Sequence, residues 1–138
     1  MPVPIFSQTL SLLPPDVHPL VMVDDEMMVR SVCTRILQTR FLVFEANSSH
    51  DALALADLIP FPLPLLVTDI SLPRMDGITL AHIWLKRHRD ARVLLLSGNS
   101  FAANFAPDIG FLQKPFVADE LLGAMQELSA GAEKVATR

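Results

Sequence analysis

The sequence lacks most of the features that would place a protein outside the cell or in a membrane. Its 138 residues contain one cysteine, Cys33, so no disulfide can form within the chain and a reducing compartment is expected. No apolar run approaches the ~18 residues that a membrane-spanning helix needs. No Lys or Arg precedes Arg30, so we expect no signal or transit peptide. These absences predict a soluble, cytoplasmic chain with no membrane span.

Positive charge is also scarce. The chain has 11 Lys and Arg against 15 Asp and Glu, a net charge of −4, so no broad basic surface is expected to bind nucleic acid. The one basic cluster, residues 86–92 (KRHRDAR), follows a helical stretch, and cations stabilise the C-terminal end of a helix. We interpret this cluster as a solvated surface.

Proline is unevenly distributed along the chain. Five of the 11 prolines fall within the first 19 residues, and proline fixes φ and removes a backbone donor. We therefore interpret residues 1–17 as a proline-rich N-terminal arm, residues 18–130 as one domain and residues 131–138 as a C-terminal tail. Gly131 is expected to end the last helix, because glycine is common just past helix ends.

Short apolar runs alternate with helical periodicity over the rest of the chain. The runs predict strands at residues 19–23, 41–46, 65–69, 92–97 and 110–113, and the helical spacing predicts helices over 28–37, 52–58, 78–85 and 121–128. Such alternation predicts an α/β fold with a parallel sheet. Only 13 residues, GNSFAANFAPDIG, separate Ser97 from Phe111. We expect one or two helical turns there at most.

Polar side chains stand at the ends of the predicted strands. Asp24 and Asp25 follow the first strand, Asp69 ends the third, Ser97 ends the fourth and Lys114 follows the fifth. Because ligands of open parallel sheets bind outside the carboxyl ends of the strands, these residues are expected to form one site.

Each of these residues also has an ordinary structural interpretation. The acidic pair can cap the following helix, Asp69 can open a turn, and an isolated lysine is most often solvated. Their coincidence at one sheet edge favours a site. Clustered carboxylates suit Mg²⁺, which prefers oxygen ligands, and Asp69 can act both as a ligand and as a carboxylate nucleophile for a phosphoryl group.

Four motifs together resemble the receiver domain of two-component response regulators. They are VMVDDE, LLVTDISLPRMDG, LLLSGNS and FLQKPF, and the resemblance covers about residues 20–130. It implies a flavodoxin-like, doubly wound (βα)5 fold with five parallel strands in the order 2-1-3-4-5. The fourth helix is expected to be shortened, since the segment before Phe111 is short.

The resemblance also implies roles for the residues of the Mg²⁺ pocket. Asp69 corresponds to the phosphoacceptor, with Mg²⁺ as the cofactor. Asp25 corresponds to the direct metal ligand, Asp24 to a ligand acting mostly through water, and the backbone carbonyl of Ser71 to a further ligand.

Three other residues take roles from the same resemblance. Lys114 corresponds to the phosphate-binding lysine, with a cis bond to Pro115. Ser97 corresponds to the switch hydroxyl and Phe111 to the aromatic switch position. Ordinary core packing is an equally good interpretation of Phe111.

The implied function is that of a phosphoacceptor, not an enzyme beyond self-catalysed phosphoryl transfer and autodephosphorylation. The donor would be a histidine kinase or a histidine phosphotransfer protein, and the downstream target is unknown. A pseudo-receiver that binds partners without phosphorylation is one alternative. A Mg²⁺-dependent aspartyl phosphohydrolase is another, but such enzymes of the haloacid dehalogenase type need an acid two residues after the nucleophile. Ser71 occupies that position.

Overall fold

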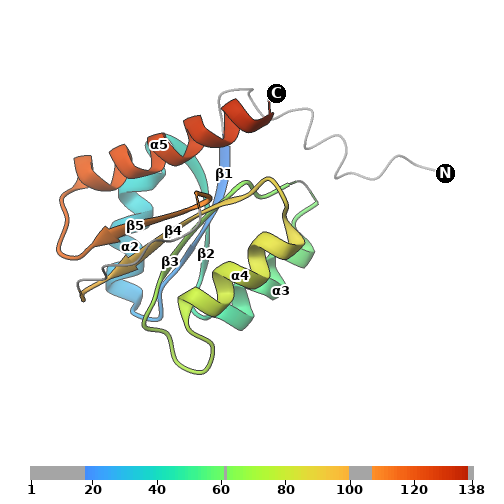
Figure 1. The fold of residues 1–138 in the computed structure, drawn as a ribbon. Helices are drawn as coiled ribbons and strands as arrows, with labels where there is room; N and C mark the ends of the chain where they lie inside the picture. Colours follow the sequence, from blue (N-terminus) through green and yellow to red (C-terminus); the bar gives the residue numbers. More distant parts are fainter. Residues whose placement is uncertain (1–17, 61, 100–106, 137–138) are drawn as a thin grey trace.

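The computed structural model describes residues 18–60, 62–99 and 107–136. At its centre is a five-stranded parallel sheet in the order β2-β1-β3-β4-β5 (Figure 1). This confirms the predicted doubly wound, flavodoxin-like arrangement. The predicted arm, residues 1–17, lies outside the described residues, as does most of the segment predicted to hold a shortened fourth helix.

The strands and helices alternate as the periodicity predicts. The strands are β1 (His18–Val23), β2 (Phe41–Ala46), β3 (Leu65–Asp69), β4 (Arg92–Ser97) and β5 (Ile109–Gln113), and the described helices are α2 (Met27–Leu37), α3 (Ser49–Leu58), α4 (Gly77–Arg87) and α5 (Ala118–Ala136). No described helix is long and apolar enough to cross a lipid bilayer.

The helices cover the sheet as two layers. Helices α2 and α5 lie on one face of the sheet, and α3 and α4 lie on the other (Figure 1). Each layer has its own apolar cluster, with Trp84 of α4 in one and Leu121 and Met125 of α5 in the other. All five residues of β3 are buried, so the strand that ends in Asp69 is fixed from both faces.

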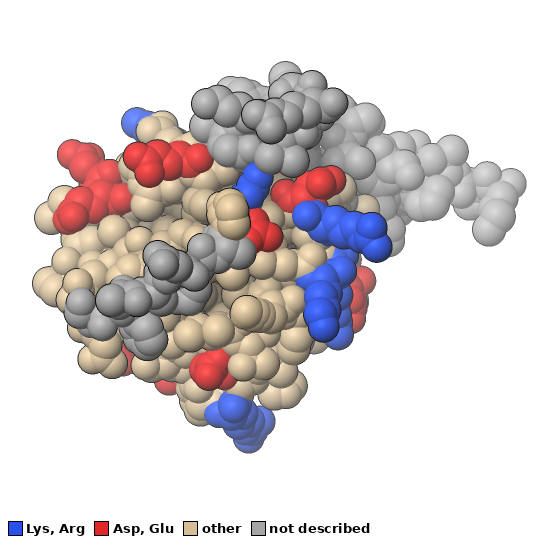
Figure 2. All heavy atoms as spheres, viewed as in Figure 1, with Lys and Arg blue, Asp and Glu red and all other residues tan. Residues whose placement is uncertain are grey.

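Helix α4 begins and ends with side chains that match its dipole. The side chain of Asp76 accepts a hydrogen bond of 2.8 Å from the backbone N–H of Thr79 at the N-cap, and Lys86 and Arg87 lie in the last turn. Both basic side chains are exposed. Figure 2 shows basic side chains gathered at the side of the molecule where α4 ends in Figure 1. Lys86 and Arg87 are therefore solvated, as predicted, whereas Arg92 of the same cluster is half-buried.

Helix α5 differs from its predicted end. It continues through Gly131 to Ala136, so the prediction that Gly131 ends the helix is wrong. A glycine inside a helix costs only about 1 kcal/mol relative to alanine, and the following residues, AEKVA, include good helix formers. The boundary predicted at residue 130 therefore falls inside a helix.

Helix α2 buries only part of its apolar stripe. Cys33 and Leu37 are buried against the sheet, whereas Met28 and Val32 are 80% and 60% exposed. The helical spacing correctly predicts the helix, but it does not tell which apolar residues face the core. A band of apolar surface is left on the outside of the helix.

The start of α4 approaches the backbone at the end of β3 very closely. The N–H of Gly77 donates a hydrogen bond of 2.9 Å to the carbonyl of Ile70. A Cβ at Gly77 would overlap the carbonyl oxygen of Asp69 and lie 2.9 Å from the Cα of Ile70. Only glycine fits without moving the strand end that carries Asp69.

We expect Gly77→Ala to lower the free energy of unfolding by about 1–3 kcal/mol, the usual cost of overpacking. Urea denaturation measures this. Gly123→Ala in α5 is the matched control, because a Cβ there meets no atom within 4 Å, and it should add about 0.5–1 kcal/mol of stability. Equal stability of Gly77→Ala and the unchanged chain would contradict the close approach.

Candidate functional site

The end of β3 places Asp69 at the carboxyl edge of the sheet. Its partner in the neighbouring strand is Leu96, and the next residue, Ile70, donates a backbone hydrogen bond of 2.9 Å to the carbonyl of Leu96. The Thr68 hydroxyl donates a bond of 2.9 Å to the carbonyl of Asp69. Asp69 is 9% exposed. The backbone that carries the carboxylate is therefore held on both sides.

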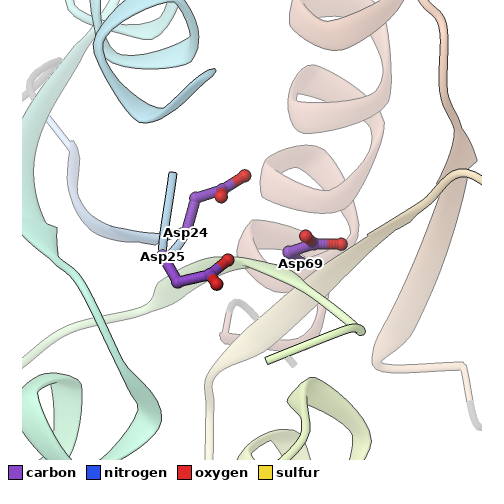
Figure 3. A group of neighbouring side chains, drawn as sticks. All are labelled: Asp24, Asp25 and Asp69. Carbon is purple, nitrogen blue, oxygen red and sulfur yellow. The ribbon is translucent and has the colours of Figure 1, made fainter. Parts of the chain in front are cut away.

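Two further carboxylates lie beside Asp69. Asp24 and Asp25 come from the turn after β1, and Figure 3 shows them next to Asp69. Each of the three offers an oxygen within 4.8 Å of the others. Asp24 is buried and Asp25 is exposed. The structure thus brings together the three acids that the sequence predicts at this edge.

Asp24 is bonded through all of its polar groups. Its N–H donates to the carbonyl of Ala46 (3.2 Å), and its carbonyl accepts from Arg30 (2.7 Å). Oδ1 accepts from the N–H of Glu26 (2.9 Å), and Oδ2 lies 3.5 Å from Lys114 Nζ. The N-cap of α2 is Glu26, which makes no side-chain capping bond. Asp24 therefore acts as a structural centre of the pocket more than as a helix cap.

Lys114 is the cation of this cluster. Its Nζ lies 3.4 Å from Asp69 Oδ2 and 3.5 Å from Asp24 Oδ2, while its N–H donates to the carbonyl of Ser97 (2.7 Å). Burial lowers the pKa of the ammonium, but the carboxylates of Asp69 and Asp24 raise it by more, so the net pKa is raised. Lys114 therefore stays charged between two acids. Its bond to Pro115 is cis, as the resemblance implies.

The pKa of Asp69 is raised above its ordinary value. Burial is the largest cause; the charge of Asp24 adds to it, and Lys114 and the N–H of Ser71 oppose it. Its ionised form is therefore less stable in the folded chain than in water. A cation that bound here would remove part of this cost.

The remaining predicted residues are Ser97, Ser71 and Phe111. Ser97 is 2% exposed, and its hydroxyl accepts a bond of 3.1 Å from the N–H of Asn99. Ser71 follows the end of β3, where its backbone N–H lowers the pKa of the Asp69 carboxyl. Phe111 is half-buried on β5 and packs against the cluster on the α3 and α4 side.

Arg30 of α2 is a site residue that the sequence reasoning missed. It reaches both Asp24 and Glu45 of β2. A cation in the first turns of a helix opposes the helix dipole, so its position was a signal that it has another partner.

An apolar groove lies beside Lys114. It has a volume of about 390 Å³ and is lined by Met28, Val29, Val32, Cys33, Lys114, Pro115 and Phe116. The exposed band of α2 forms one wall of this α2 groove, and the loop that leads from β5 into α5 forms the other. The groove therefore opens next to the acid cluster.

Comparison with known proteins assigns the chain to a family. The sequence profile of the response regulator receiver domain matches residues 20–126, which include the whole site. The chain belongs to the response regulator receiver domain family. Receiver domains are signalling modules of two-component systems and generally bind Mg²⁺ at an acidic pocket.

Curated relatives are larger than this chain. Sensor kinase CckA of Brucella abortus (strain 2308) is 35% identical over 115 residues, which are 79% of this chain and 12% of that protein. Response regulator MprA of Mycobacterium tuberculosis (strain ATCC 25618 / H37Rv) is 30% identical over 115 residues, which are 79% of this chain and 49% of MprA. The chain therefore spans about half or less of these relatives.

Solved structures of receiver domains share the fold. The receiver domain of the hybrid histidine kinase CckA has a TM-score of 0.65 and 31% identity, covering 80% of this chain and 97% of that one. A response regulator receiver protein from Sinorhizobium medicae WSM419 has a TM-score of 0.76 and 23% identity, covering 86% of this chain and 99% of that one. The second likeness concerns the fold alone.

The donor set of the pocket fits Mg²⁺. All candidate ligands are oxygen atoms, and the three carboxylate oxygens are close enough to share one ion. Both oxygens of Asp24 already have partners. Lys114 also pairs with Oδ2 of Asp69, so the exposed carboxylate of Asp25 is the one best able to bind a cation directly.

We expect Asp69→Asn to raise the free energy of unfolding at neutral pH by about 0.5–2 kcal/mol, the range of typical stabilising substitutions. The folded pKa of Asp69 lies above the unfolded value of 3.8, so the ionised side chain costs stability above the folded pKa. As the pH falls through the raised pKa towards 3.8, Asp69 becomes protonated and the gain should shrink.

Urea denaturation at several pH values in metal-free buffer measures this difference. Glu127→Gln, which removes an exposed carboxylate from α5, is the matched control and should leave stability nearly unchanged. A destabilising Asp69→Asn substitution at pH 7 would show that Lys114 more than offsets the burial of Asp69.

Proposed function

We propose that this receiver domain is a phosphoacceptor that takes a phosphoryl group onto Asp69 and signals by the resulting change of conformation. The observation that carries the proposal is the position of Asp69, with Lys114 Nζ 3.4 Å from its Oδ2 and two further acids beside it. A carboxylate in this setting has an ammonium and a cation-binding pocket at hand for an incoming phosphoryl group.

The proposed transfer is a displacement at phosphorus. A carboxylate oxygen of Asp69 forms the new bond, and the bond from phosphorus to the donor histidine nitrogen breaks. The electron pair stays on the departing nitrogen, and because the other ring nitrogen of the reacting phosphohistidine carries a proton, the imidazole leaves as neutral histidine. The product is an aspartyl phosphate on Asp69.

The residues around Asp69 stabilise the charge that the phosphoryl group carries. The Lys114 ammonium is placed to move from the carboxylate to a phosphoryl oxygen. When bound at the pocket, Mg²⁺ would neutralise further oxygens of the phosphoryl group. Asp25 and Asp69 would hold the ion, with Asp24 and the carbonyl of Ser71 completing the set.

The proposed switch begins at Ser97. The phosphoryl group adds about −1.5 to −2 charges, and the Ser97 hydroxyl, next to the bend that holds Asn99, can donate a hydrogen bond to it. Movement of Ser97 would pull the segment after β4. Phe111 has no hydroxyl, so it can respond only by changing its packing against the neighbouring core.

The proposed donor is a histidine kinase or a histidine phosphotransfer protein. A protein donor has to bring its histidine to the carboxyl edge of the sheet, and the α2 groove offers apolar surface there. Met28 and Val32 are both exposed on its wall, and contiguous exposed apolar surface commonly marks a site for a protein partner. We propose that the donor docks along α2.

The proposed location is the cytoplasm, where such donors act. The domain could stand alone or belong to a hybrid kinase, and its 35% identity to a sensor kinase supports the second arrangement.

Among the alternatives, a pseudo-receiver has no need of the intact acid cluster. A phosphohydrolase needs an acid at position 71, where the chain has Ser71. In the proposal, catalysis is limited to self-phosphorylation and autodephosphorylation.

Incubation with Mg²⁺ and acetyl phosphate tests the proposal. We expect one phosphoryl adduct by intact mass, absent in Asp69→Asn and absent without Mg²⁺, because both the nucleophile and the charge neutralisation are needed. Glu127→Gln is the control and should form the adduct normally.

No adduct, with no chemical-shift change on adding beryllofluoride, would favour a pseudo-receiver. Rapid release of inorganic phosphate from phosphate esters would favour a hydrolase. Either result overturns the proposed function.

The docking surface has its own test. With a histidine phosphotransfer protein that phosphorylates the unchanged chain, Val32→Glu should slow transfer at least about tenfold, as loss of an interface anchor commonly does. The rate with acetyl phosphate should stay unchanged. Leu58→Glu, at the end of α3, is the matched control, since Leu58 is 75% exposed but lies on the opposite layer. Equal effects of both substitutions would contradict docking along α2.

A further inference from the structure

We infer that Arg30 is a positioning residue of the Mg²⁺ pocket: its guanidinium fixes the peptide between Asp24 and Asp25, and so aims the carboxylate of Asp25. The inference rests on the proposed function only in that it assumes a cation-binding pocket. Arg30 contacts neither Asp69 nor a predicted metal-binding oxygen, so any effect on the ion would act through Asp24.

The contacts of Arg30 join three elements. From α2, its Nη1 donates a hydrogen bond of 2.7 Å to the backbone carbonyl of Asp24, in the turn after β1. Its Nε lies 3.3 Å from Oε1 of Glu45 on β2. Nε makes no hydrogen bond among the described residues, so the contact with Glu45 is an ion pair only.

The two contacts differ in burial. The Arg30 side chain is 16% exposed, whereas that of Glu45 is 42% exposed. An exposed ion pair contributes little, while a short bond from a charged donor to a carbonyl is among the stronger hydrogen bonds. The bond to Asp24 is therefore the important one, and Glu45 serves mainly to orient the guanidinium.

The hydrogen bond from Arg30 to the carbonyl of Asp24 also constrains Asp25, through covalent geometry. The carbonyl of Asp24 and the N–H of Asp25 belong to one planar peptide. The N–H of Asp24 is held by Ala46, and Arg30 holds the carbonyl at the other side of the residue. Without Arg30 this peptide could rotate, and the exposed carboxylate of Asp25 would lose its fixed direction while the buried Asp24 side chain kept its own bonds.

Charge and positioning predict opposite results for the loss of Arg30. The guanidinium is a positive charge near a cation site, so by Coulomb's law alone its removal should strengthen Mg²⁺ binding. If Arg30 positions Asp25, its removal should weaken Mg²⁺ binding. The sign of the change therefore separates the two roles.

The experiment compares Mg²⁺ affinity by NMR titration in the unchanged chain, Arg30→Met, Arg30→Lys and Arg35→Met. Arg35→Met is the matched control, because Arg35 is an exposed arginine on the same helix. We expect Arg30→Met to bind Mg²⁺ about tenfold more weakly, because loss of a residue that supports a metal ligand typically lowers metal affinity by this much. Arg30→Lys should fall between, because one ammonium can replace the bond to Asp24 but cannot also reach Glu45.

Two further readouts separate positioning from a general loss of structure. With acetyl phosphate, the half-saturating Mg²⁺ concentration should rise in Arg30→Met, while the rate at saturating Mg²⁺ stays near that of the unchanged chain. The affinity ratio should also persist between about 0.05 and 0.5 M salt, because screening weakens charge effects more than hydrogen-bond geometry. Circular dichroism checks that each variant is folded; if Arg30→Met unfolds, Arg30→Lys alone decides.

Unchanged or tighter Mg²⁺ binding in a folded Arg30 variant overturns the inference, as does equal weakening in Arg35→Met. An unchanged chain that binds Mg²⁺ but takes up no phosphoryl group overturns the proposed function alone, and the affinity comparison still decides the role of Arg30. A chain that binds no Mg²⁺ overturns the inference as well.

Discussion

The site depends on one ammonium held between two carboxylates. Lys114 lies 3.4 Å from Asp69 and 3.5 Å from Asp24, and without it two buried like charges would meet at the sheet edge. Parallel strands make this possible, because β1, β3 and β5 all deliver their carboxyl ends to that edge. Lys114 itself is anchored by a backbone bond to Ser97. The cation thus links three strand ends into one unit.

The balance of charge in this unit is incomplete. Lys114 lowers the pKa of Asp69, yet burial and Asp24 raise it by more. Three carboxylates, those of Asp24, Asp25 and Asp69, lie around this one ammonium, so the pocket has more acidic than basic groups. An added cation or phosphoryl group changes the electrostatic energy of such a site strongly, because charges interact more strongly in a partly buried setting than in bulk water. This is the physical basis on which a bound cation or a phosphoryl group could change the conformation.

The sequence predicted the features that follow from strand order and periodicity. Asp24, Asp69 and Lys114 meet because topology brings their strand ends together, and topology can be inferred from alternating apolar runs. It did not predict the end of α5, since Gly131 costs a helix too little to stop it. The sequence also did not predict the contacts of Arg30, because they depend on how α2 packs against β2. Features set by tertiary packing leave only weak signals in one sequence.

Packing also explains why the side-chain oxygens that face Lys114 can serve chemistry without holding the strand ends in place. The carbonyl of Asp24 is bonded by Arg30, and that of Asp69 by the Thr68 hydroxyl. Gly77 lets α4 start against the backbone of Asp69 without a clash. In each case the backbone is fixed by groups other than the carboxylate. The side-chain oxygens can therefore exchange one partner for another, an ammonium for a cation or a phosphoryl group, while the strand ends that carry them stay in place.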